Sequence, residues 1–115
     1  MLRIKMWFPP YLSRDSLEKL KEEVKQAVHA MPELCLSGQT DASPILVPGS
    51  CGVYVQAYCT LHCPRPQKAL IRERLAAGLG RAVANNMPRA TPIWVYVYSS
   101  VLGQEARWKS KPASW

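Results

Sequence analysis

The sequence predicts an α/β fold of the α+β kind, in which two βαβ repeats form a four-stranded mixed sheet with two helices on one face. Three observations predict this fold. Segments rich in β-branched and aromatic residues alternate with amphipathic helical segments. The two halves of the chain follow the same plan, because a single shift aligns Ile4 with Val55 and Leu20 with Ile71. A helix between two strands then favours parallel strand pairs within each half.

Length and composition favour one globular domain. At 115 residues the chain is too short for two separate cores. We therefore expect a single domain over 1–115, with repeat one at about 1–48, repeat two at about 53–102 and a C-terminal tail at 103–115. No run of about 18 apolar residues occurs, which excludes a membrane span. The start of the chain lacks the apolar core of a signal peptide, so we expect a cytoplasmic protein.

The first repeat begins with a strand over Arg3–Phe8, whose alternation points Ile4, Met6 and Phe8 inward. Ser13 then has the character of a helix N-cap, and an apolar stripe at steps of three and four residues predicts a helix from Arg14 onward that Pro32 closes. Two short apolar segments, 34–37 and 45–47, compete for the second strand, and 38–43 is expected to be a loop.

The second repeat begins with a strand over Val53–Leu61, followed by a helix over Gln67–Ala84. Gly78 and Gly80 weaken that helix, so we expect close packing against the sheet at these positions. The last strong strand covers residues 92–99, and the tail suggests one short edge strand at 106–109.

Charge and cysteine content narrow the classes of partner. The formal net charge of +7 fits a nucleic acid, an anionic membrane or a small acidic ligand. The basic residues are scattered, which favours a solvated basic surface over a nucleic-acid patch. The cysteines form no Cys-x-x-Cys pair, and along an extended strand Cys59 and Cys63 share one face while His62 points to the other. We therefore expect reduced thiols, no metal site and no cofactor.

Several motifs go beyond the fold pattern. They are the turn Val47-Pro48-Gly49-Ser50, the segments Cys59-Thr60-Leu61-His62, Val95-Tyr96-Val97-Tyr98 and Gln67–Glu73, and the late Trp108. In order and spacing they resemble the macrophage migration inhibitory factor and 4-oxalocrotonate tautomerase families of the tautomerase superfamily. The two βαβ repeats alone fit both the tautomerase fold and a ferredoxin-like sandwich. The resemblance favours the first, and it implies a homotrimer with pockets between subunits.

The resemblance also implies a set of site residues. Family members use an N-terminal proline as a base, but Leu2 follows Met1 here, so the prolyl amine is missing. The primary amine of Met1, with an ordinary pKa of about 8, is the remaining candidate base. Tyr96 matches the family's active-site tyrosine and Trp108 its aromatic wall. Arg65, and Arg14 as its repeat counterpart, match an arginine that binds a substrate carboxylate. The expected ligand-binding set is Leu2, Arg14, Arg65, Tyr96 and Trp108.

These residues predict a tautomerase-like protein that binds a small carboxylate or carbonyl compound and has lost proline-based chemistry. Any remaining activity would be a keto–enol isomerisation with Met1 or Tyr96 as proton carrier. A non-catalytic binding or interaction protein is the alternative, favoured by the missing base. A basic ferredoxin-like nucleic-acid binder is the third hypothesis, although no RNP1 motif occurs on Val53–Leu61.

Overall fold

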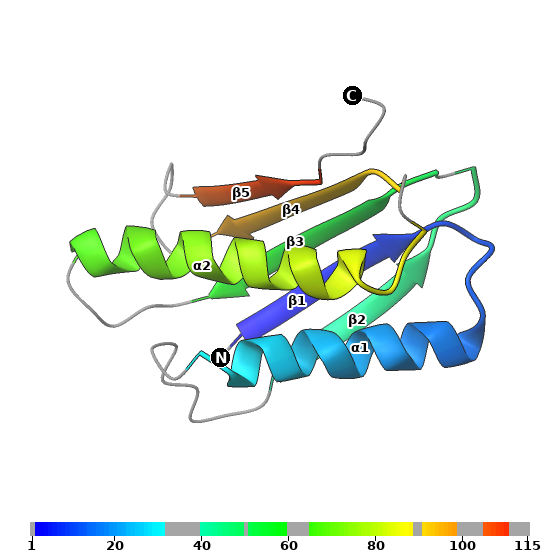
Figure 1. The fold of residues 1–115 in the computed structure, drawn as a ribbon, viewed down its shortest axis with the longest axis horizontal. Coiled ribbons are helices and arrows are strands. Elements are labelled where there is room, and N and C mark those ends of the chain that lie inside the picture. Colours follow the sequence, from blue (N-terminus) through cyan, green and yellow to red (C-terminus); the bar gives the residue numbers. More distant parts are fainter. Residues whose placement is uncertain are drawn as a thin grey trace.

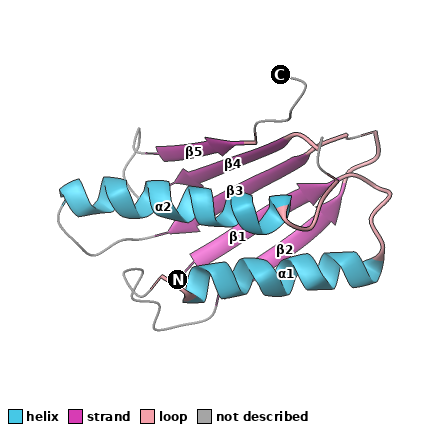
Figure 2. Ribbon diagram, in the orientation of Figure 1, coloured by secondary structure: helices cyan, strands magenta, loops and turns pink. Residues whose placement is uncertain are grey.

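The computed structural model describes residues 2–31, 40–49, 51–59, 65–88, 91–98 and 105–110. These residues form two helices and five strands in the order β1 (Leu2–Phe8), α1 (Arg14–His29), β2 (Thr40–Leu46), β3 (Val53–Cys59), α2 (Arg65–Ala84), β4 (Ile93–Tyr98) and β5 (Glu105–Lys109). The strands make one sheet, and both helices cover the same face of it (Figures 1 and 2). The α+β architecture expected from the sequence is confirmed.

The sheet order β2-β1-β3-β4-β5 joins the two repeats at its centre. β1 pairs in parallel with β2, and β3 pairs in parallel with β4, as the helical connections require. The two halves meet where β1 pairs antiparallel with β3. The sheet has five strands rather than the expected four, because the short strand suggested in the tail adds to β4 antiparallel as β5.

The second strand differs most from the expectation. β2 begins at Thr40, inside the segment 38–43 that was expected to be a loop, and it includes only part of the competing segment 45–47. The other competitor, 34–37, lies outside the described residues. β2 is an edge strand, so Pro44 is tolerated there and few apolar side chains are needed. Its pairing with β1, which sequence periodicity cannot reveal, makes it a strand.

Helix boundaries follow local chemistry. Ser13 caps α1, since its hydroxyl oxygen accepts a hydrogen bond from the Ser16 amide at 3.2 Å. The helix ends at His29, three residues before Pro32. α2 begins at Arg65, two residues earlier than expected, with Pro66 inside its first turn. Neither helix, within the described part of the chain, is long and apolar enough to cross a membrane.

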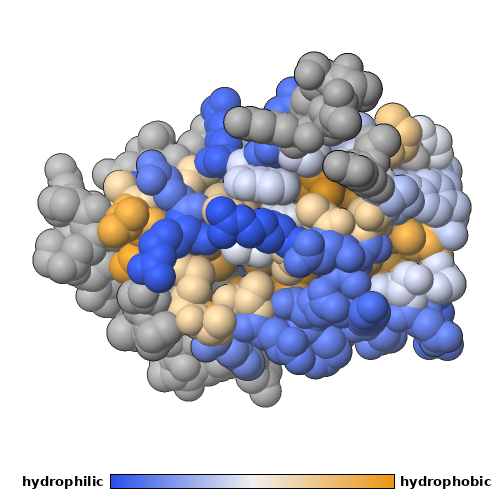
Figure 3. All heavy atoms as spheres, viewed as in Figure 1, coloured by the Kyte–Doolittle hydropathy of each residue, from blue (hydrophilic) through white to orange (hydrophobic). Residues whose placement is uncertain are grey.

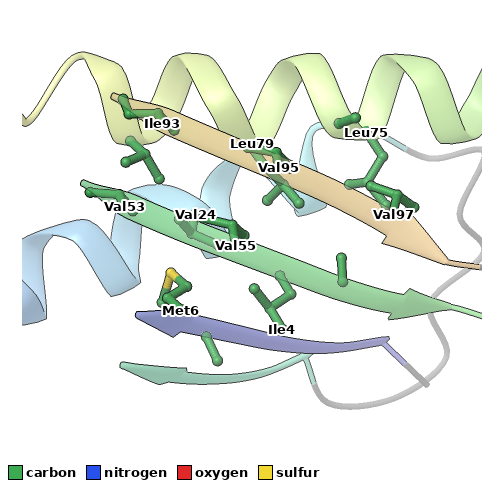
Figure 4. Packing of buried hydrophobic residues seen from close by; sticks show 14 of the residues in the cluster. Ile4, Met6, Val24, Val53, Val55, Leu75, Leu79, Ile93, Val95 and Val97 are labelled. Carbon is green, nitrogen blue, oxygen red and sulfur yellow. The ribbon is translucent and has the colours of Figure 1, made fainter. Parts of the chain in front are cut away.

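The core lies between the sheet and the helices. Ile4, Met6 and Phe8 are fully buried, as their alternation predicted. Facing side chains from α1, α2, β3 and β4 fill the rest of this layer (Figure 4). The surface over the helices is mostly hydrophilic, with apolar patches between the charged residues (Figure 3).

Of the two glycines in α2, one is required by packing. A Cβ atom on Gly80 would lie 2.1 Å from Cε3 of Trp108, so only glycine lets α2 approach β5 this closely. A Cβ atom on Gly78 would meet nothing within 4 Å. The expected close packing is therefore confirmed at Gly80 and wrong at Gly78.

Candidate functional site

The face of the sheet that the helices do not cover carries most of the aromatic side chains of the strands. Alternation along each strand places them opposite the buried positions, as the burial of Ile93, Val95 and Val97 shows for β4. We call this surface the aromatic face, and its aromatic members are Trp7, Tyr54, Tyr58, Trp94, Tyr96 and Tyr98.

Five of these rings form a connected network. The Trp7 ring meets Tyr54 edge-on at 5.8 Å between centroids, and Tyr54 stacks on Tyr96 at 5.1 Å. Tyr96 continues to Tyr98 at 6.3 Å, and Tyr98 stacks on Tyr58 at 5.2 Å. Each such pair adds about 0.5–1.5 kcal/mol beyond the burial of its area. The network links side chains of β1, β3 and β4 across the sheet.

Cations accompany the rings. Arg3 and Lys5 alternate with the buried residues of β1 and are exposed, as are Arg107 and Lys109 on β5. The Arg107 guanidinium carbon lies 5.6 Å from the centroid of the Tyr96 ring, which is cation–π distance. The face therefore combines stacking surface with groups that bind anions.

The start of β1 is held inside the sheet, at one end of the aromatic face. Leu2 pairs with Thr40 of β2 on one side and with Cys59 of β3 on the other. The neighbouring Arg3 is paired with Tyr58, which is 43% exposed and itself pairs with Tyr98. We call Arg3, Tyr58 and Tyr98 the β1-start cluster.

The chemistry of the β1-start cluster suits a small planar acid. A guanidinium can pair with a carboxylate, and a phenol ring can stack on a flat conjugated group. The Tyr58 hydroxyl donates a hydrogen bond to Oε1 of Gln56 at 2.9 Å, which fixes the ring beside Tyr98. Sequence reasoning missed all three residues, although the alternation of aliphatic with aromatic residues on β3 and β4 indicates that a second face exists.

The structure separates several of the site residues expected from the sequence. Tyr96 is half-buried on the aromatic face, whereas Trp108 packs on the helix face against Gly80. In register, Trp108 is opposite Val95 and Arg107 is opposite Tyr96. Within one chain, Tyr96 and Trp108 therefore do not line a common wall.

The two expected arginines also lie apart. Arg14 is exposed at the first residue of α1, at the end of the sheet where β1 finishes. Arg65 begins α2 at the opposite end, where β1 begins and β3 and β4 finish (Figure 1). The backbone thus brings Leu2 and Arg65 to the same end of the sheet as the β1-start cluster. Met1 lies outside the described residues.

No metal centre is evident in the part of the chain that the structure describes, because no three His, Cys, Asp or Glu side chains gather there. The described Cys51 is exposed and forms no disulfide. Cys63 and His62 fall outside the described residues.

Comparison with known proteins establishes the fold. No family model and no curated protein matches the sequence. Among solved structures, Pt0534 inactivated by 2-oxo-3-pentynoate matches with a TM-score of 0.61 and 14% identity, over 90% of this chain and 93% of that one. MIF2 of Leishmania major matches with a TM-score of 0.58 and 13% identity, over 91% and 97%. The chain has the tautomerase/MIF-like fold.

A third matching structure of this fold was solved as an oligomer. Wild-type fused 4-OT, solved as an asymmetric trimer, matches with a TM-score of 0.59 and 13% identity, over 89% of this chain and 93% of that one. Near-complete coverage in both directions means that the likeness includes both repeats. At this low identity, the likeness is one of fold.

Proposed function

We propose that this chain is a tautomerase-like protein that binds a small carboxylate or carbonyl compound in a pocket between the subunits of a homotrimer, and that proline-based chemistry is lost. The observation that carries the proposal is the position of the β1 start. Its first residues are held between two strands and lie beside a guanidinium and a stacked pair of tyrosines. A ligand seated there is next to the N-terminal backbone.

The aromatic face supports self-association. Large solvent-exposed aromatic surfaces are typical of protein–protein interfaces, because burying them against a partner lowers the free energy. Trp7, Tyr54, Trp94 and Tyr96 are only half-buried in the single chain, and Ile45 on β2 is 43% exposed. Fused 4-OT is a trimer with the same fold. A trimer would also allow Arg14, remote from the β1 start in its own chain, to reach a neighbouring pocket.

The proposed chemistry is weak acid–base catalysis or none. Leu2 stands where the family has its catalytic proline, so the base would be the primary amine of Met1, with Tyr96 as the other candidate proton carrier. Arg65, Arg14 and Arg3 would hold a carboxylate, and Leu2 would supply an apolar wall. A pocket with apolar walls and a few charged groups fits a small 2-oxo acid.

Phenylpyruvate is a suitable probe of this site. Its enol–keto conversion is followed by absorbance, and its binding by NMR chemical shifts, with the wild-type protein and with protein acetylated at Met1. We expect saturable binding in both, and slow turnover that acetylation abolishes. Arg3→Gln should weaken binding about three- to fivefold, as expected for one partly exposed ion pair. Lys19→Gln, on the exposed side of α1, is the matched control and should change nothing.

Three outcomes would contradict parts of the proposal. Turnover that survives acetylation rejects the amine as base. Binding without any turnover in the wild type leaves a non-catalytic binding protein. Absence of saturable phenylpyruvate binding rejects the ligand class.

One observation favours a second function, single-stranded nucleic-acid binding. Bases stack on exposed aromatic rings of sheets, and cations nearby pair with phosphates. The aromatic face has both, with Arg3, Lys5, Arg107 and Lys109 around the rings. A short single-stranded oligonucleotide that binds with a steep loss of affinity on adding salt would support this candidate. Binding that is absent at low salt would reject it.

A further inference from the structure

The helix side of the molecule carries a groove that the proposed function does not use. It lies between α1 and α2 and has a volume of about 380 Å³. Its apolar lining comes from both helices and consists of Ala27, Met31, Leu70, Ala77 and Gly78. We call this the helix groove. Its volume falls within the range of small-molecule sites, about 300–1,000 Å³.

The helix groove exists because the two helices approach at one end and separate at the other. Asn86, just after α2, donates through Nδ2 to the Glu23 carboxylate of α1 and to the Ala82 carbonyl oxygen at 2.8 Å. This contact closes the end of the helix pair near the finish of α2. Toward the start of α2 the helices diverge (Figure 1), and small residues at Ala27 and Ala77 leave the space between them unfilled.

Gly78 is the second observation that points to a ligand here. Glycine in the middle of a helix costs about 1 kcal/mol relative to alanine. Gly80 is needed for contact with Trp108, but a Cβ atom on Gly78 would meet nothing within 4 Å. Packing against the described residues therefore does not explain this glycine. Its effect is to deepen the helix groove at its middle.

The walls of the groove are apolar and its margin is basic. Leu70, which is 55% exposed, lines the groove. Arg74 and Arg81 lie seven residues apart on α2 and both line the groove, together with a single acid, Glu73. Two guanidinium groups against one carboxylate give the margin a net positive charge.

We propose that the helix groove binds a monomeric amphipathic anion, an acyl-chain carboxylate, with its chain on the apolar lining and its carboxylate at Arg81. Charge complementarity with Arg81 selects an anion, and the apolar lining selects an acyl chain. The site lies on the helix side, whereas the aromatic face lies on the other side of the sheet. Its occupancy is therefore independent of the proposed tautomerase-like function and of self-association through the sheet.

The test is an NMR titration of the full chain with decanoate below its micelle concentration, following the backbone amides of Ala77 and Gly78. We expect saturable shifts at these amides and not on β3 or β4. Octanoate should bind more weakly, by about two- to fourfold for each methylene removed, because each buried methylene contributes up to about 0.8 kcal/mol. Decyltrimethylammonium, with the same chain and the opposite charge, should bind poorly.

Variants separate the contribution of the apolar lining from that of the charged margin. Gly78→Leu fills the groove and should abolish the shifts, whereas Gly78→Ala changes affinity little and serves as the folded control. Arg81→Gln should weaken decanoate about three- to fivefold, the effect of one exposed ion pair, and Lys19→Gln should have no effect.

The proposal is overturned if decanoate produces no saturable shifts at Gly78. It is also overturned if the cationic detergent binds as tightly as decanoate, or if Gly78→Leu binds decanoate normally. Phenylpyruvate binding at the β1 start is unaffected by any of these results, so the two proposals fail separately.

Discussion

At the scale of single residues, a substitution at Gly78 offers the simplest test of the open space beside α2. Gly78→Ala should raise the free energy of unfolding by about 0.5–1 kcal/mol, because alanine restricts the unfolded chain and the added methyl meets no neighbour. Urea denaturation followed by circular dichroism measures this difference. A loss of stability would mean that the helix groove is narrower than described.

Asn86 is the second residue whose role can be isolated. Asn86→Asp removes the amide donor and places a carboxylate against that of Glu23, so we expect a loss of about 1–3 kcal/mol in unfolding free energy. Asn85→Asp is the matched control. It adds the same charge one residue away at an exposed position and should change stability by less than about 0.5 kcal/mol. Equal effects of the two substitutions would show that the Asn86 contact is unimportant.

At the scale of elements, the contact between α2 and β5 depends on one pair of residues. Gly80→Ala should cost about 1–3 kcal/mol, since its methyl group would overlap the Trp108 ring. In a Trp108→Val background the ring is gone, and the same substitution should stabilise by about 0.5–1 kcal/mol through helix propensity. A double-mutant cycle from urea denaturation gives the coupling. Additive effects would contradict the close packing of these elements.

The elements also show where sequence reasoning succeeds. β1, β3 and β4 have strong alternation because one face of each packs on the helices, so Ile4, Met6 and Val95 could be placed in the core from the sequence. β2 lacks that signal, since as an edge strand it buries little besides Ala42. β2 forms through its long-range pairing with β1, and no local sequence pattern predicts that pairing.

The candidate site could be predicted only in part for a related reason. Tyr96 is proposed through the family resemblance, whereas Arg3, Tyr58 and Tyr98 come together through the register of three strands. A shift of one residue in register would move each of them to the other face. Trp108 illustrates this, because it was expected beside Tyr96 and instead packs on the helix face.

At the scale of the whole molecule, self-association should depend on the aromatic face. Trp7→Lys places a cation among the rings that we expect to be buried between subunits, and it should convert trimer to monomer because an unpaired charge at an interface is costly. Within the chain it removes one edge-on contact with Tyr54, about 0.5–1.5 kcal/mol, so each subunit should stay folded. Sedimentation and circular dichroism check both statements. Lys19→Glu on the helix side is the control and should leave the assembly intact.

The central claim is that a chain of tautomerase/MIF-like fold assembles so that the β1 start meets a neighbouring subunit. The most direct test is the mass in solution by light scattering at micromolar concentration, with the intact N-terminus determined by mass spectrometry on the same sample. We expect three times the chain mass of 12.9 kDa, with Leu2 rather than proline following any retained Met1. A monomer at 12.9 kDa would contradict it, because the β1-start cluster would then face water alone and no inter-subunit pocket would exist.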